Sequence, residues 1–112
     1  MRVMKQINSL EEINNIINTA QPVLIYFSAE NCSVCEVLKP KVNTEIKAKF
    51  DKFGIYEIKA NLHKEIASKF SVFSIPTMLV YFDKKEFFRY GRNVSLSLIL
   101  EEIRRPYELF YK

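Results

Sequence analysis

The residues most able to do chemistry are two cysteines, Cys32 and Cys35, which are separated by two residues. Such a pair can cycle between dithiol and disulfide: one thiolate attacks a substrate disulfide and the second thiol resolves the mixed disulfide. A purely structural bridge is the weaker interpretation, because so short a loop stabilises a fold little. Zinc is a further alternative, but the chain adds only His63 to the pair, so a closed site would need a second chain. We predict no bound metal and interpret His63 as a solvated side chain.

The residues around the cysteines predict a strand followed by a long helix. Val23–Phe27 is a continuous β-prone run, typical of a central strand that is covered on both faces. Beyond the cysteines, apolar residues recur at helical spacing, and Pro40 predicts a kink in this helix. This apolar side of the helix consists of Val34, Val37, Leu38, Val42, Ile46 and Phe50. Cys32 then lies where unpaired N–H groups stabilise a thiolate, and Cys35 lies one turn further in, shielded.

The rest of the chain predicts an α/β domain. Strands are predicted at Val3–Ile7, Ile55–Lys59, Thr77–Phe82 and Glu86–Tyr90, and helices at 10–20, Lys64–Phe70 and 96–103. Ser9 and Glu12 form a capping box, and Asp83–Lys85 is short enough for a hairpin turn. Pro106 kinks or ends the last helix and leaves Tyr107–Tyr111 as a tail that packs down. The predicted order is β-α-β-α-β-α-β-β-α, a single domain over residues 1–112 whose central mixed sheet has helices on both faces.

Composition limits the classes of protein. The chain has 112 residues, of which 48% are apolar, and a net charge of +4, so it is long enough for one globular domain. The longest apolar runs, Val23–Phe27 and Met78–Phe82, are far shorter than the ~20 residues of a membrane span. The first twenty residues carry Glu11 and Glu12 where a secretory signal would be apolar, so we expect a cytoplasmic protein. The basic residues are scattered, and we expect neither nucleic-acid nor membrane partners.

Four separate features resemble the thioredoxin family. Residues 23–35 resemble its strand-then-CxxC element, and Pro40 matches the proline of the helix that follows. Ile75-Pro76-Thr77 resembles its cis-proline loop, and Gly91 lies where a glycine follows the last strand. The resemblance runs from about Val3 to Ile103. It implies a thioredoxin fold, a cis Ile75–Pro76 bond beside the cysteines, and substrate binding by Ile75, Pro76 and Gly91.

Three departures from the family pattern lie near the cysteines. Ser33 and Val34 replace the family's Gly-Pro pair, which leaves the reduction potential open. Asn31 replaces an aromatic residue and could serve as the helix cap instead. Glu36 replaces a lysine, and its charge would oppose a thiolate nearby.

A fourth departure concerns proton transfer. Tyr26 stands where the family has a buried aspartate that is thought to exchange a proton with the resolving cysteine, and a tyrosine cannot act as a base at neutral pH. Lys59 matches the family's lysine and would lack its carboxylate partner. One hypothesis is that Cys35 loses its proton to water, or to Lys59 with a pKa lowered by burial. The alternative is that Tyr26 only packs.

The resemblance implies a protein-disulfide reductase that cycles Cys32–Cys35 and takes part in cell redox homeostasis. Its substrates would be disulfide-containing proteins presented as extended chain, re-reduction would come from a separate reductase or thiol donor, and no cofactor is implied. The alternative is a non-catalytic binding or redox-sensing module that uses the peptide groove beside Pro76.

Overall fold

The structure is a computed structural model that describes residues 4–112. Within these residues the chain forms β1 (Lys5–Gln6), α1 (Leu10–Asn18), β2 (Val23–Ser28), α2 (Ser33–Lys49), β3 (Gly54–Lys59), α3 (Lys64–Lys69), β4 (Thr77–Phe82), β5 (Lys85–Tyr90) and α4 (Leu96–Phe110). The predicted order of elements is therefore confirmed. The strand predicted at Val3–Ile7 is shorter in the structure, and Val3 lies outside the described residues.

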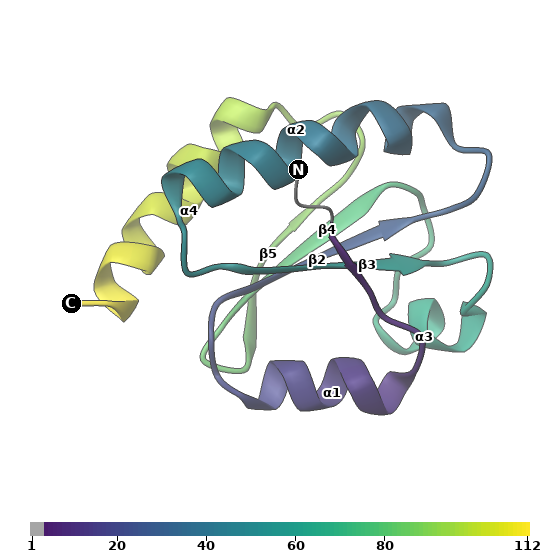
Figure 1. Cartoon of the computed structure of the whole chain (residues 1–112), viewed down its shortest axis with the longest axis horizontal. Coiled ribbons are helices and arrows are strands. Elements are labelled where there is room, and N and C mark those ends of the chain that lie inside the picture. The colour runs from purple at the N-terminus through teal and green to yellow at the C-terminus, as the bar shows by residue number, and fades with distance from the viewer. Residues whose placement is uncertain (1–3) are drawn as a thin grey trace.

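The strands form one mixed sheet in the order β1-β3-β2-β4-β5. β1 and β2 run parallel to β3, whereas β4 is antiparallel to both β2 and β5 (Figure 1). β2 is central, and all six of its residues are buried. This burial explains why its sequence is apolar without alternation.

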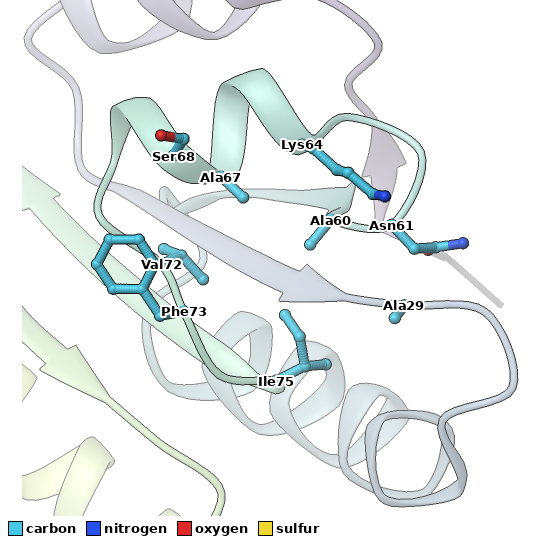
Figure 2. Close-up of a pocket in the computed structure, with 9 residues that line it drawn as sticks. All are labelled: Ala29, Ala60, Asn61, Lys64, Ala67, Ser68, Val72, Phe73 and Ile75. Atoms are coloured by element: carbon cyan, nitrogen blue, oxygen red, sulfur yellow. The ribbon is translucent and has the colours of Figure 1, made fainter.

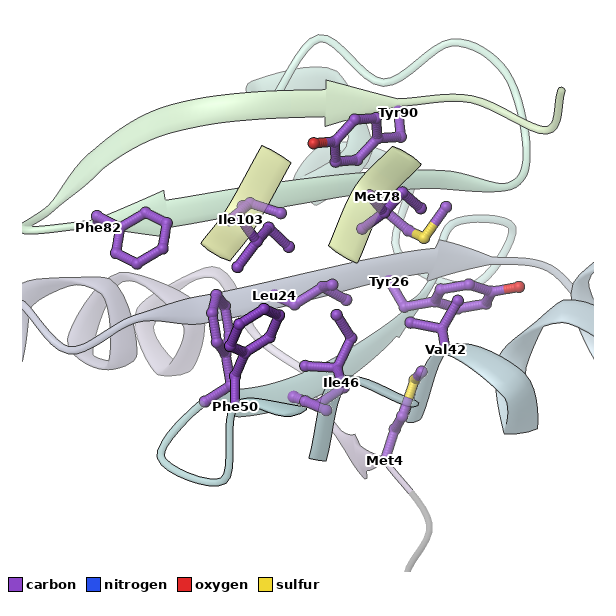
Figure 3. Packing of buried hydrophobic residues seen from close by; sticks show 14 of the residues in the cluster. Met4, Leu24, Tyr26, Val42, Ile46, Phe50, Met78, Phe82, Tyr90 and Ile103 are labelled. Carbon is purple, nitrogen blue, oxygen red and sulfur yellow. The ribbon is translucent and has the colours of Figure 1, made fainter. Parts of the chain in front are cut away.

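The sheet separates two apolar cores. Leu24 and Tyr26 of β2 belong to the core under α2 and α4, whereas Ile25 and Phe27 belong to the core over α1 and α3. The alternation follows from the strand period of two. Figure 1 shows the two helix pairs on opposite faces of the sheet, and Figure 3 shows the α2–α4 core, in which Tyr26 lies among aliphatic side chains. No helix within residues 4–112 is both long enough and apolar enough to span a membrane.

Two predictions about the helices need correction. α4 does not end at Pro106 but continues to Phe110, so the expected tail is helical. Tyr107 packs on Phe50, with ring centroids 4.8 Å apart, and Phe110 packs on Phe82. This burial offsets the roughly 3 kcal/mol that a proline costs inside a helix. In α2, Val34 and Val37 are 40% and 60% exposed, so the first turn of the predicted apolar side does not face the core.

The hairpin between β4 and β5 turns through Asp83 and Lys84, whose φ angles are 52° and 69°. This left-handed region disfavours side chains with a Cβ, so Lys84→Gly should raise the free energy of unfolding by about 0.5–1 kcal/mol. Lys85→Gly is the matched control: it lies in β5, where glycine should destabilise by a similar amount. Urea denaturation midpoints check both variants. Two variants of equal stability would contradict the expectation.

Candidate active site

The two cysteines form a disulfide at the N-terminus of α2, with their Cα atoms 5.3 Å apart. Cys32 is the N-cap residue, and its Sγ accepts a hydrogen bond of 3.3 Å from the backbone N–H of Cys35. Cys32 is partly exposed, whereas Cys35 is fully buried. The sulfur of Cys32 is therefore the one that a partner can reach, and an N–H at the helix terminus is already aimed at it.

Asn31 serves the turn that leads into the helix rather than its cap. Its φ of 60° lies in the left-handed region, which asparagine tolerates better than most residues. The interpretation of Asn31 as the helix cap is wrong, because Cys32 occupies that position. Backbone geometry thus accounts for the polar residue that replaces the family's aromatic.

The loop before β4 lies at the same end of the sheet as the turn that carries the cysteines, because Thr77 pairs with Phe27 near the end of β2. The Ile75–Pro76 bond is cis, as the resemblance implied, and the side chains of Ile75 and Cys32 pack against the same core. The Arg92 guanidinium donates a 3.2 Å hydrogen bond from Nη2 to the carbonyl oxygen of Ile75. This contact places the segment after β5, including the exposed Gly91, next to the cis-proline loop. A Cβ at Gly91 would meet no atom within 4 Å, so this surface is open.

A pocket of about 340 Å³ flanks the other side of this loop (Figure 2). It is lined by Ala29, Ala60, Asn61, Lys64, Ala67, Ser68, Val72, Phe73 and Ile75. Phe73 is 85% exposed, the largest exposure among the large apolar side chains of residues 4–112. This exposed aromatic ring offers apolar contact area beside the cis-proline loop.

Tyr26 ties the sheet to the reactive turn. Its side chain is fully buried, and its hydroxyl donates a 2.9 Å hydrogen bond to the carbonyl oxygen of Cys35. Burial raises the pKa of Tyr26 well above its ordinary value, and the charges of Glu57 and Glu36 raise it further. The hydroxyl is therefore a neutral donor that cannot accept a proton near neutral pH. It positions the backbone of Cys35 and does more than pack.

Removing this hydroxyl should weaken the fold without changing proton transfer. We expect Tyr26→Phe to lower the free energy of unfolding by about 1 kcal/mol, the usual net value of one hydrogen bond. The single-turnover rate of the resolving step should keep its pH profile between pH 6 and 9. Tyr26→Asp is the contrast, because a carboxylate there is able to accept a proton. A profile that changes in Tyr26→Phe would show that the hydroxyl takes part in proton transfer.

Glu57 is the buried carboxylate of the site, with 1% of its side chain exposed. It lies beside Tyr26 in the parallel pairing of β2 with β3. Ser28 Oγ donates to Glu57 Oε2 at 2.6 Å, Lys39 Nζ donates to its Oε1 at 3.2 Å, and Gln6 also donates to it. Burial alone would raise the pKa of Glu57, but these hydrogen bonds and the charges of Lys39 and Lys59 lower it below its ordinary value. Glu57 is thus held as a carboxylate.

The expectation that Lys59 lacks a carboxylate partner is wrong. Its Nζ lies 3.4 Å from Glu57 Oε2 and 3.7 Å from Glu36 Oε2. Lys39 contacts the same two carboxylates, with Nζ 3.9 Å from Glu36 Oε2. Two carboxylates and two ammonium groups therefore form a balanced network between α2 and β3. This network also offsets part of the charge that Glu36 brings to the first turn of α2.

The position of Glu57 within its strand indicates that its side chain faces the core. In a strand, residues two apart share a face, so Glu57 lies on the same side as the core residue Ile55. A carboxylate on the inner face of a central strand requires partners. Those partners come from β1, β2 and α2, which only the fold brings together.

His63 and the metal alternative can be placed as well. His63 is the N-cap of α3, its Nδ1 lies 4.0 Å from Glu65 Oε1, and its side chain is only 18% exposed. The interpretation of His63 as a solvated side chain is therefore wrong. Within residues 4–112, no three side chains of His, Cys, Asp or Glu gather into a candidate metal site.

Comparison with known proteins decides the family. Residues 4–105 match the sequence profile of the family described as Thioredoxin. The chain belongs to the thioredoxin family. It is 31% identical over 110 residues to the thioredoxin-like protein YdfQ of Bacillus subtilis, which covers 98% of this chain and 97% of that protein.

Two further comparisons show how far the similarity of this thioredoxin-family chain extends. It is 28% identical over 83 residues to the chloroplastic thioredoxin X of Arabidopsis thaliana, covering 74% of this chain but only 46% of that longer protein. The crystal structure of thioredoxin from Trypanosoma brucei brucei superposes with a TM-score of 0.81 at 21% identity, covering 94% of this chain and 91% of that one. The thioredoxin fold is therefore established, and thiol–disulfide oxidoreductase chemistry at Cys32–Cys35 follows from the family together with the disulfide.

Proposed function

We propose that this thioredoxin-family chain is a protein-disulfide reductase. The observation that carries the proposal is the position of the disulfide: Cys32 lies partly exposed at the N-terminus of α2, and the cis-proline loop lies at the same end of the sheet and packs against the same core. The helix terminus stabilises the thiolate that attacks, and the loop offers backbone against which an extended substrate can lie.

The reaction balances in two exchange steps. The Cys32 thiolate attacks one sulfur of a substrate disulfide, forms a mixed disulfide, and releases the other substrate sulfur as a thiolate. Cys35, after losing its proton, attacks Sγ of Cys32, closes the disulfide seen in the structure, and releases the second substrate thiolate. A separate dithiol or reductase returns two electrons and two protons to the pair.

Proton transfer from Cys35 needs an acceptor other than Tyr26. Lys59 is held by Glu57 and Glu36, so its ammonium group is engaged in ion pairs and not isolated by burial. We therefore assign the proton of Cys35 to water. The resolving step should then be steep in pH.

Substrate recognition is assigned to the segment around Pro76. The backbone N–H of Ile75 makes no backbone hydrogen bond within residues 4–112 and is available to a peptide carbonyl. Gly91 leaves room on one side of this segment, and the pocket that Phe73 and Ile75 line offers apolar contact on the other side. We propose disulfide-containing proteins as substrates, with a locally unfolded segment that pairs in the extended form.

Cellular context follows from the proposed chemistry. A reductant needs a compartment in which other thiols keep it reduced, so we propose the cytoplasm and a part in redox homeostasis there. The electron donor would be a separate reductase or thiol pool, and electrons would pass from it through Cys32–Cys35 to the substrate.

The reduction of insulin by dithiothreitol tests the proposal. We expect micromolar protein to speed the appearance of insulin turbidity well above the rate with dithiothreitol alone. A rate equal to that background would instead favour the non-catalytic binding or redox-sensing module. A glutathione titration measures the reduction potential of Cys32–Cys35 and so shows in which direction the pair exchanges electrons. A potential near −270 mV indicates a reductant, and one above about −180 mV indicates an oxidant or isomerase.

A further inference from the structure

A second hollow, which we call the α2 hollow, lies next to the attacking cysteine. It has a volume of about 340 Å³ and is lined by Ser33, Val34, Val37, Leu38, Lys41 and Arg92. Positions 34, 37, 38 and 41 follow one face of a helix, so they form a continuous stripe along α2. Because Ser33 directly follows Cys32, a side chain bound in the hollow would lie beside the disulfide under attack.

The floor of the α2 hollow is apolar and unpartnered. Val34 and Val37 are both exposed although they lie in the first two turns of a helix that packs on the core. Covering such exposed aliphatic side chains with an apolar stem is favourable, because it removes apolar surface from water. The hollow therefore favours an occupant with at least a short hydrocarbon segment.

The rim of the α2 hollow is positive. It carries Lys41 and Arg92 and no carboxylate, and within residues 4–112 neither cation forms an ion pair. Glu36, the acidic residue in the first turn of α2, is engaged with Lys39 and Lys59 and does not line the hollow. The charge that complements the positive rim is therefore an anion supplied by a partner.

Arg92 connects this rim to the peptide-binding loop. Its Nη2 donates to the carbonyl oxygen of Ile75, so the guanidinium lies between the α2 hollow and the backbone that a substrate strand would approach. A guanidinium has further N–H groups, and its planar fork matches a carboxylate. A carboxylate entering the hollow would meet donors that are already oriented.

We propose that the α2 hollow is a specificity subsite for an acidic residue of the substrate, next to the substrate cysteine that Cys32 attacks. The aliphatic part of a glutamate covers Val34 and Val37, and its carboxylate binds Arg92 and Lys41. This inference rests on the proposed reductase function and deepens it, because it names the substrate class: protein segments with an acidic residue beside the disulfide. An apolar neighbour would cover Val34 and Val37 but would bring no negative charge to the rim. A basic neighbour would be repelled by the cations of the rim, so neither type meets both requirements.

Three matched peptides test the subsite. Each is an alanine-rich decapeptide with one cysteine, used as its symmetric disulfide dimer, with Glu, Gln or Lys next to the cysteine. The fully reduced protein is mixed with each dimer, and single-turnover rates are measured by chromatography. Each rate is divided by the rate of the same dimer with dithiothreitol, which corrects for the effect of the neighbouring charge on the leaving thiol.

We expect the glutamate dimer to react about tenfold faster than the lysine dimer at low salt, equivalent to about 1.4 kcal/mol. The glutamine dimer should lie between them, and 0.5 M salt should bring the rates together. Arg92→Ala should reduce the Glu-to-Gln ratio to about one, Arg92→Lys should restore part of it, and Lys41→Ala should lower it. Lys85→Ala is the control: it removes an exposed cation at the hairpin end of β4 and β5, remote from Pro76, and should leave the ratio unchanged.

Equal normalised rates for the three dimers in the wild type would overturn the subsite, as would a preference that persists in the Arg92→Ala Lys41→Ala double variant. Binding provides an independent measurement: the same peptides with serine in place of cysteine are titrated against the oxidised protein. If the wild type reduces none of the dimers but still binds the glutamate peptide more tightly through Arg92, the reductase proposal fails and the subsite stands. If it reduces all three equally, the reverse holds.

Discussion

Replacement of Cys32 by serine should bring insulin reduction down to the rate of dithiothreitol alone. The first step needs a thiolate at the N-terminus of α2, and a serine hydroxyl there is not ionised at neutral pH. The fold should persist, because Cys32 is partly exposed and a disulfide across so short a loop adds little stability. Circular dichroism and the urea midpoint provide the check on folding.

Cys35→Ser should fail at the second step and not at the first. The Cys32 thiolate still attacks, but no second thiol resolves the mixed disulfide, so the substrate stays attached. Intact mass spectrometry after mixing with a peptide disulfide should show an adduct of one peptide mass, which dithiothreitol removes. An adduct that forms on Cys35 in Cys32→Ser, and not on Cys32 in Cys35→Ser, would reverse the assigned roles.

Glu57→Gln should be the most destabilising single change among the polar residues of the site. Glutamine keeps the shape but leaves Lys39 and Lys59 without their buried counter-charge. Loss of one partner of a buried pair is strongly unfavourable, and we expect about 2–3 kcal/mol because both lysines keep some contact with solvent. Glu36→Gln is the matched control: it contacts the same two lysines from an exposed position and should cost under about 1 kcal/mol.

The effect of Glu57 should depend on pH with a definite sign. Its pKa is lowered in the folded protein, so its contribution to stability is complete above the ordinary value of 4.5 and is lost as the pH falls through the folded value. The difference in unfolding free energy between wild type and Glu57→Gln should therefore be constant from pH 7 to about 5 and shrink below that. Urea titrations at several pH values measure it. A difference that grows in acid would mean that Glu57 is protonated in the native state.

The fold could be predicted from the sequence to the extent that local rules determine it. The structure confirms the buried strand at Val23–Phe27 and the cis Ile75–Pro76 bond that the resemblance implied. Of the Ser9–Glu12 capping box it shows one half: Ser9 Oγ accepts a hydrogen bond from the backbone N–H of Glu12, whereas Glu12 Oε1 accepts from the N–H of Asn8 and not from that of Ser9. Local rules determine the ends of elements less well than their cores. Pro106 carried a strong local signal for termination, but tertiary packing of Tyr107 and Phe110 outweighed it.

The site could be predicted only in part, because its polar contacts join residues that are distant in sequence. The cysteines and the proline loop carry their own motifs. The partners of Lys59 do not: Glu57 is on the same strand, and the strand period places it on the inner face, but its contact with Lys39 depends on how α2 crosses β3. Arg92 likewise acquires its place only when the segment after β5 meets the loop before β4.

The hydrogen bond between Tyr26 and Cys35 has a consequence for how another protein could distinguish the two redox forms. It joins a phenol to a peptide oxygen and not to sulfur, so it does not depend on whether the two thiols are oxidised. Reduction of the disulfide therefore removes neither partner of this hydrogen bond, and we expect Tyr26 to hold the backbone of Cys35 in both halves of the cycle. A protein that distinguishes the two redox forms would find this contact in both, so we expect it to recognise the sulfur atoms themselves.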